Sequence, residues 1–180
     1  MLNTDPSTIA SISDLVAQGN RAQLTDAAFR RELLAWIRFN PDAAVRTGDG
    51  LAGRCTGNPS LPTWLGKLLA PIAIRARTQV ERDTDYIRSA AGIAIFVADS
   101  DNKPAWIETG RAYQRFALQA AALDIRTAFI NQPIEVSALR GQLERLLGLD
   151  GGHAQLAVRF GHGALAPYSL RRPIDQVIDP

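Results

Sequence analysis

The residues best suited to chemistry in this chain stand near its C-terminus, where two adjacent arginines follow a glycine-rich turn. A largely apolar run over residues 154–160 leads into Gly161 and Gly163, and Arg171 and Arg172 come a few residues later. Backbone N–H groups at a turn and forked guanidinium groups are donors that hold a phosphate. The pattern therefore predicts an anion-binding corner.

Other side chains that often take part in catalysis are few. Cys55 is the only cysteine, and His153 and His162 are the only histidines. A single cysteine excludes a disulfide within the chain, and two histidines are too few for a histidine-rich metal cluster. No histidine stands near Cys55 in sequence to activate a thiolate. We therefore predict no metal site and leave the catalytic residues unassigned.

Composition narrows the class of protein further. The 180 residues are 46% hydrophobic and 21% charged, as in ordinary globular proteins, and a single core is sufficient at this length. The net charge of +2 is too small to favour a nucleic-acid partner. The N-terminus lacks a secretion signal, and the apolar stretch over residues 61–74 is too short and too interrupted to span a bilayer. We expect a cytoplasmic protein without a membrane or nucleic-acid partner.

The elements that must position these residues alternate between helices and strands. Apolar residues at helical spacing predict helices from Pro6 to about Gly19, from near Thr25 to Asn40, from Lys103 onward and over residues 139–147. Apolar runs predict strands over residues 91–98, 125–130 and 155–160, and residues 173–177 are expected to be extended. Strands between longer helices predict a fold of α and β layers, in one domain over residues 1–180.

Two of these segments bear on function. The helix from Lys103 is apolar on nearly every side over residues 116–123, which is typical of a buried helix, and Gly110 would allow close backbone approach. Residues 61–88 are apolar at first and charged later. That segment is interpreted either as an amphipathic lid or dimer-contact segment, or as an ordinary core helix.

Several of these residues, in this order and spacing, resemble the FMN-dependent nitroreductase family. The matching positions are Trp106, Gly110, Tyr113, Gln114, Leu118, Ala120 and Ala121, the turn over residues 131–135, and the tail segments 158–161 and 171–173. They are most similar to the C-terminal part of the divergent branch whose longer chains hold two nitroreductase-like halves in tandem. The resemblance implies an α+β nitroreductase-like fold, in which a mixed, mostly antiparallel sheet packs with helices that include a long buried central helix.

The resemblance also implies where a flavin ring would lie. In the family, a turn like the one formed by Gln132, Pro133, Ile134 and Glu135 lies against the ring, and a backbone N–H group of the turn faces the reactive ring nitrogen. Hydrogen bonds donated to the ring stabilise the charge of the reduced flavin and tune its potential. The four residues are therefore expected to bind the cofactor.

The phosphate end of the cofactor is assigned by the same resemblance. Basic residues like Arg171 and Arg172 reach the FMN phosphate in the family, which puts Gly161 and Gly163 in the same anion-binding corner. From the residues alone a second interpretation stays open. In it, both arginines pair at the surface with acidic side chains such as Asp175 or Glu135.

By this resemblance the chain is an FMN-dependent oxidoreductase in which NAD(P)H reduces a nitroaromatic or quinone-like acceptor. The cofactor carries the hydride, so no catalytic side chain is required. The family's arginine- and serine-rich opening segment is not matched before Pro6, so the chain is expected to hold only part of a flavin site. Its expected partner is a second copy of the chain, as a homodimer, or a missing nitroreductase half.

Two alternatives from other classes stay open. In the first, the fold sequesters FMN under a lid such as residues 61–88, with little turnover. In the second, the chain is a cofactor-free half-domain that completes the site of a partner across a large interface. An isolated half of that kind exposes apolar surface.

Overall fold

The computed structural model describes residues 1–56, 59–73 and 76–178, and the chain groups into two compact units. The first, called here the sheet unit, comprises residues 1–25 and 76–164. The second, called the helical unit, comprises residues 26–75 and 165–180. The interpretation of residues 1–180 as one domain stays a prediction.

The sheet unit is built on a four-stranded antiparallel sheet in the order β1-β4-β6-β5. Its strands are β1 (Leu2–Asn3), β4 (Gly92–Ala98), β5 (Arg126–Phe129) and β6 (His153–Gly161). β4 and β6 pair along their length, with one irregularity of register between Phe96 and Val97. This arrangement confirms the predicted α+β class with an antiparallel sheet.

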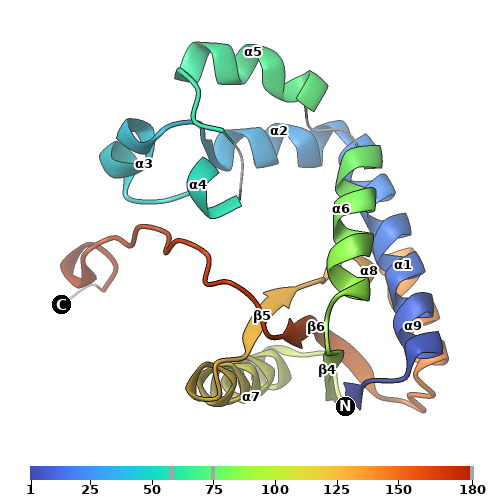
Figure 1. The fold of residues 1–180 in the computed structure, drawn as a ribbon. Helices are drawn as coiled ribbons and strands as arrows, with labels where there is room; N and C mark the ends of the chain where they lie inside the picture. Colours follow the sequence, from blue (N-terminus) through green and yellow to red (C-terminus); the bar gives the residue numbers. More distant parts are fainter. Residues whose placement is uncertain (57–58, 74–75, 179–180) are drawn as a thin grey trace. The chain divides into compact units, whose positions relative to one another are not determined.

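Helices lie on both faces of this sheet (Figure 1). One face is covered by α1 (Pro6–Thr25), α6 (Ala76–Arg88), α8 (Gln132–Glu135) and α9 (Ser137–Leu146), and the other by α7 (Lys103–Ala122). The hydrophobic core lies on the first of these faces. It contains Ile12, Leu15, Val16, Ile87, Ile93, Ile95, Ile130, Leu139, Leu143, Ala154 and Ala157.

The first helix differs from its predicted extent. Asp5 begins it as expected, because its Oδ2 accepts a hydrogen bond from the Thr8 N–H group at 2.8 Å. The helix does not end at Gly19 and Asn20 but continues to Thr25. The glycine has a packing role instead, since a Cβ atom at Gly19 would lie 2.6 Å from the Cβ of Gln132.

The expectation that the long central helix is buried is wrong. Of the residues of α7 only Thr109 and Ala120 are buried, whereas Trp106 is 50% exposed and Leu118 66% exposed. The helix covers one face of the sheet and packs against it with one of its own sides only. That side includes Phe116, whose ring centroid lies 5.7 Å from that of Phe96.

The helical unit is small and mostly helical. It contains α2 (Ala27–Trp36), α3 (Pro41–Thr47), α4 (Gly53–Thr56), α5 (Thr63–Ala73), the 3-10 helix η1 (Ile174–Gln176) and a two-stranded parallel sheet of β2 (Ile37–Arg38) and β3 (Leu51–Ala52). The extended conformation expected for residues 173–177 is therefore wrong, since one turn of helix forms there.

The segment predicted as a lid, residues 61–88, is divided between the two units. Its first part forms α5 in the helical unit, and its second part forms α6, which packs against α1 in the sheet unit. Residues 74 and 75 lie outside the described residues. A lid or contact role for α5 stays a prediction.

The cytoplasmic location of the protein also stays a prediction. In the part of the chain that is described, no helix has the length and apolar character to cross a membrane.

Candidate functional site

The turn expected to face a flavin forms the short helix α8, directly after β5. Pro133 is fully buried, Ile134 packs against the core and Glu135 is exposed. The Glu135 side chain accepts a hydrogen bond from Gln23 Nε2 at 2.6 Å, which ties the turn to the C-terminal part of α1. The turn therefore offers the aliphatic side chain of Ile134, next to the Glu135 carboxylate, which already accepts a hydrogen bond from the neutral Gln23 amide.

The backbone N–H groups of this turn are used within the turn itself. The N–H groups of Ile134 and Glu135 donate to the Asn131 carbonyl at 2.8 and 2.9 Å. The next N–H group, of Val136, donates to the Gln132 carbonyl at 3.1 Å. A flavin ring that approached from the side of the turn would have to share these donors.

A polar network behind the turn holds it in place. Asn20, which is 4% exposed, donates through Nδ2 to Asp83 Oδ2 at 2.8 Å. Gln132 Nε2 donates to Asn20 Oδ1 and to Asp83 Oδ2, both at 3.3 Å, and Gln79 Nε2 donates to the other Asp83 oxygen at 3.0 Å. The Gln132 side chain is thus directed into the protein, where it joins α8 to α1 and α6.

The two glycines of the predicted anion corner lie at the end of β6. Gly161 is the last residue of the strand and pairs with Arg126 of β5 in the sheet register. A Cβ atom at Gly161 would lie 3.0 Å from the Ala91 backbone nitrogen, so a close approach of the backbone favours glycine here. Gly163 follows the strand, and a Cβ atom there would meet nothing within 4 Å.

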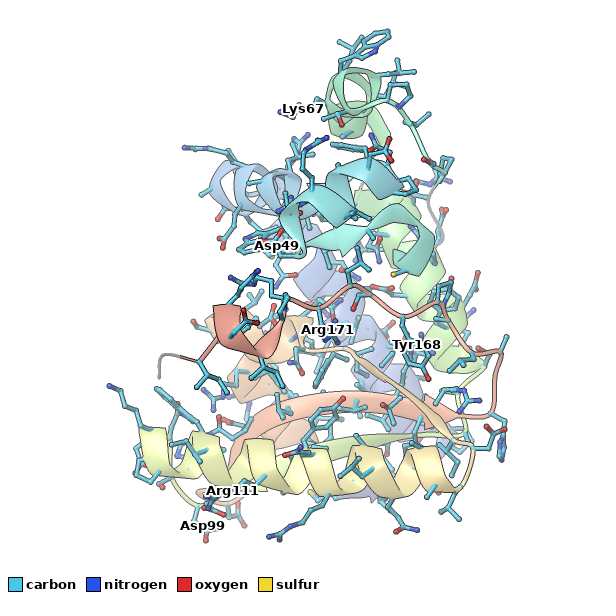
Figure 2. The ribbon with its side chains drawn as sticks, turned by 90° about the vertical axis from the view of Figure 1, so that its left-hand side faces the viewer. Asp49, Lys67, Asp99, Arg111, Tyr168 and Arg171 are labelled. Carbon is cyan, nitrogen blue, oxygen red and sulfur yellow. The ribbon has the colours of Figure 1, made fainter. Side chains whose placement is uncertain are left out.

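Both predicted phosphate-binding arginines belong to the helical unit. Arg171 and Tyr168 lie along the irregular segment that precedes η1 (Figure 2). Arg171 Nη1 donates to the Ser169 hydroxyl and, at 3.3 Å, to the Leu170 carbonyl. Arg172 lies beside the turn at Gly48, where a Cβ atom would be 3.3 Å from Arg172 Cγ.

The acidic neighbour of Arg172 is Asp49. The pKa of the Asp49 carboxyl lies below its usual value, chiefly because Arg38 donates a hydrogen bond to it, with further contributions from Thr47 and from the charge of Arg172. Arg38 Nη2 lies 2.7 Å from Asp49 Oδ1. The predicted cofactor residues are therefore divided, with the turn and the glycines in the sheet unit and the arginines in the helical unit.

Sequence reasoning missed two arginines next to Gly161. Arg159 projects from the same face of β6 as Gly161, and its Cζ lies 4.9 Å from the ring centroid of Tyr86 on α6. Arg126 stands opposite Gly161 on β5. The period of two along residues 155–161 could have indicated the position of Arg159. Arg126 carries no such signal, because the register between β5 and β6 is a tertiary feature.

A second polar cluster lies where β4 leads into α7. Asp101 accepts hydrogen bonds from Trp106 Nε1 at 2.6 Å, from Gln155 Nε2 at 3.2 Å and from Arg140 Nη1 at 2.9 Å. These hydrogen bonds lower the pKa of Asp101 to about 2, and the bond from Trp106 has the largest effect. The cluster links the start of α7 to α9 and β6.

Among the described residues no group of three His, Cys, Asp or Glu side chains is placed to hold a metal ion.

The comparison with known proteins supports a distant relationship to oxidoreductases of the nitroreductase type. Two curated proteins of Mycobacterium tuberculosis, from strains CDC 1551 and H37Rv, are each 24% identical to this chain over 172 residues. Both are named putative NAD(P)H nitroreductase. The aligned region covers 92% of this chain and 47% of each relative, so the chain spans about half the length of the curated relatives it matches. No family model and no solved structure matches the chain.

Proposed function

We propose that this chain is a nitroreductase-like half of an FMN-dependent oxidoreductase that uses NAD(P)H to reduce nitroaromatic or quinone-like acceptors. The observation that carries the proposal is the similarity of nearly the whole chain to about half the length of proteins named as NAD(P)H nitroreductases. That coverage agrees with a tandem arrangement in which this chain corresponds to one half. We infer the C-terminal half from the resemblance of residues 158–161 and 171–173 to the family's tail. Its fold is then nitroreductase-like.

The residues present fit FMN in part. Ile134 offers an aliphatic surface for the ring, while the network of Asn20, Asp83 and Gln132 holds the turn rigidly for that contact. In the helical unit, Arg171 and Arg172 are exposed guanidinium groups that suit a phosphate. In the sheet unit, the backbone at Gly161 and Gly163 stays a predicted anion-binding turn. FMN supplies the hydride chemistry when it is bound, and these residues bind and orient it.

Large apolar side chains exposed on α7 support a pairing with a second copy of the chain or with a missing half. Trp106, Ile107 and Leu118 are all exposed on this helix. Exposed apolar groups of this size on one element are typical of an interaction surface. The same observation favours the alternative of a cofactor-free half-domain that completes the site of a partner. A flavin-sequestering protein is the other alternative, and in it α5 would cover the cofactor.

The experiment that separates these functions is the visible spectrum of the purified protein after incubation with FMN and desalting. The wild-type chain is expected to retain a flavin band, and the double variant Arg171→Ala, Arg172→Ala to lose it. Two charge-assisted hydrogen bonds contribute about 3–6 kcal/mol, which weakens binding more than a hundredfold when both are removed. The variant Arg31→Ala, Arg145→Ala, at exposed positions of α2 and α9, changes the net charge equally and is expected to keep the band.

Each result has a definite meaning. A retained band that NAD(P)H bleaches supports the oxidoreductase, and bleaching should be followed by turnover of a nitroaromatic acceptor. A retained band that NAD(P)H does not bleach supports flavin sequestration. If the wild-type chain retains no flavin, the half-domain alternative replaces the proposal, and co-purification with the missing half becomes the next experiment.

A further inference from the structure

We propose that Arg126 and Arg159 form an anion-binding position in the sheet unit, suited to the phosphate group of a nucleotide-type ligand. It is built from residues of the sheet unit alone, whereas Arg171 and Arg172 belong to the helical unit. The geometry of β5, β6 and α6 supports this position without reference to the proposed function. Only the identity of its ligand, as a flavin or nicotinamide nucleotide, rests on the proposed function.

The sheet register places both arginines on the same face. Arg126 pairs with Gly161, and Ala128 pairs with Arg159. Side chains of directly opposed residues project from the same face of an antiparallel sheet, as do those of alternate residues along a strand. Arg126 and Arg159 are therefore diagonal neighbours, about 7–8 Å apart at their Cα atoms. Gly161, directly opposite Arg126, adds no side chain to fill the space between them.

The Arg159 guanidinium is held in place by an aromatic ring. Its Cζ lies 4.9 Å from the ring centroid of Tyr86, which is within range of a cation–π interaction. A guanidinium over a ring still has N–H groups that can donate to an oxyanion. Within residues 1–56, 59–73 and 76–178 no carboxylate forms an ion pair with Arg159. Its positive charge is thus both oriented and uncompensated.

The positive charge of Arg126 is only partly compensated by a carboxylate. Its Nη2 lies 2.6 Å from Asp124 Oδ1, and the Asp124 side chain is 81% exposed. Its Nε is buried and has no hydrogen-bond partner in the described part of the chain. A buried donor without an acceptor costs free energy. The Arg126 side chain would therefore gain by turning toward a bound oxyanion that its Nε can reach. One carboxylate beside two guanidinium groups leaves a net positive charge at this end of the sheet.

Asp124 provides a way to strengthen the position without weakening the fold. Its backbone is left-handed, with φ at 58°, a conformation that asparagine adopts about as well as aspartate. Asp124→Asn therefore removes the competing negative charge and keeps the turn before β5. Because unfolding does not raise affinity for an anion, a gain of binding in this variant cannot be a folding artefact.

The test is a titration of the full chain with inorganic phosphate, followed by the Nε–Hε signals of arginine in a 15N correlation spectrum. Chloride at equal ionic strength is the reference. We expect saturable shifts for Arg126 and Arg159, affinity lowered about tenfold in Arg159→Gln and in Arg126→Gln, and affinity raised in Asp124→Asn. Arg111→Gln on α7 is the matched control and should bind phosphate as the wild type does. Signals that do not move, or that move equally with chloride, overturn the proposal.

The source of the phosphate is identified with matched ligands. If the position takes the flavin phosphate, Arg159→Gln weakens FMN binding and leaves riboflavin binding unchanged. If it takes the phosphate of a nicotinamide dinucleotide, FMN binding is unchanged and the KM for NAD(P)H rises instead. Phosphate binding that neither nucleotide competes for overturns the assignment to a nucleotide. The phosphate titration requires no bound flavin, so its result stands even if the proposed oxidoreductase function fails.

Discussion

One carboxylate, that of Asp101, connects three parts of the sheet unit. It accepts hydrogen bonds from Trp106 on α7, Gln155 on β6 and Arg140 on α9. All three donors prefer the ionised form, and they lower the pKa of Asp101 from 3.8 to about 2. A carboxyl group with a lowered pKa in the folded state stabilises that state above its unfolded pKa and loses the effect as the pH falls through the folded value.

We predict that Asp101 contributes to stability at pH 5 and that most of this contribution is lost by pH 2. The measurement is urea unfolding of the wild type and of Asp101→Asn at several pH values between 5 and 2. The difference in free energy of unfolding between the two proteins should shrink as the pH falls from about 4 toward 2, because the wild-type carboxyl becomes protonated. Asp99→Asn, at a neighbouring exposed carboxylate labelled in Figure 2, is the matched control. A difference that stays constant down to pH 2 contradicts the prediction.

At this scale the sequence was informative about residue types but not about their partners. The stretch from Asn131 to Glu135 was correctly singled out as a turn, yet its hydrogen bonds were not foreseeable. Gln132 meets Asn20, which is 112 positions away, and Asp83, which is 49 positions away. No local pattern encodes contacts over such separations. The cofactor role of the turn stays a prediction, and the network behind it is a structural finding.

The two long helices of the sheet unit contain glycines in opposite environments. A Cβ atom at Gly19 of α1 would lie 2.6 Å from the Gln132 Cβ and 2.9 Å from the Gln132 carbonyl carbon. A Cβ atom at Gly110 of α7 would meet nothing within 4 Å. Glycine weakens a helix relative to alanine, so only a close contact gives it a structural reason.

We therefore predict opposite effects for the two alanine substitutions. Gly110→Ala should raise the free energy of unfolding by about 0.5–1 kcal/mol, because alanine has less conformational freedom to lose. Gly19→Ala should lower it, since overpacking against the backbone of Gln132 costs about 1–3 kcal/mol, more than the gain in helix propensity. Urea unfolding measures both. If Gly110→Ala is instead destabilising at high protein concentration and stabilising at low concentration, the outer side of α7 packs closely against another chain.

Elements with a clear period were predictable, and those set by tertiary contacts were not. The strand expected over residues 91–98 is β4, and the helix expected from Lys103 begins there because Asn102 caps it and Pro104 follows. The exposure of α7 was not predictable, because an apolar helix gives the same pattern whether its outer side is covered within the chain or by another chain. The 3-10 turn of η1 is too short to leave a period.

The two units of the molecule differ in the size of their hydrophobic cores. The sheet unit contains the cluster of large aliphatic side chains, including Ile12, Ile87 and Leu143. In the described part of the helical unit, the buried hydrophobic residues are Ala43, Ala44 and Ala70. Burial of large aliphatic side chains is the main stabilising contribution to folding, so the two units should differ in stability.

We predict that hydrogen exchange at the backbone amides separates the two units. Amides of β4 and β6 should exchange slowest, near the global free energy of unfolding, while those of α2, α3 and α5 should exchange through openings of lower free energy. The measurement is exchange followed by mass spectrometry at peptide resolution, with denaturant added in steps. Equal protection of α3 and β6 at every denaturant concentration would mean that the two units unfold as one.

The irregularity of register between β4 and β6 bears on how the protein behaves at high concentration. β1 pairs with β4 only at Ile93 and Ala94, and Met1 meets Ile95 beyond them. In the described structure no strand lies beside residues 96–98 on that side, and such an open edge is a template for strand addition between molecules. The register shift falls between Phe96 and Val97, where this coverage ends. The extra residue of this irregularity is Gln155 of β6, because Phe96 pairs with Leu156 and Val97 with Ala154. Since a bulge increases the local twist of a strand pair, we expect it to turn the open edge of β4 away from flat pairing with a second molecule.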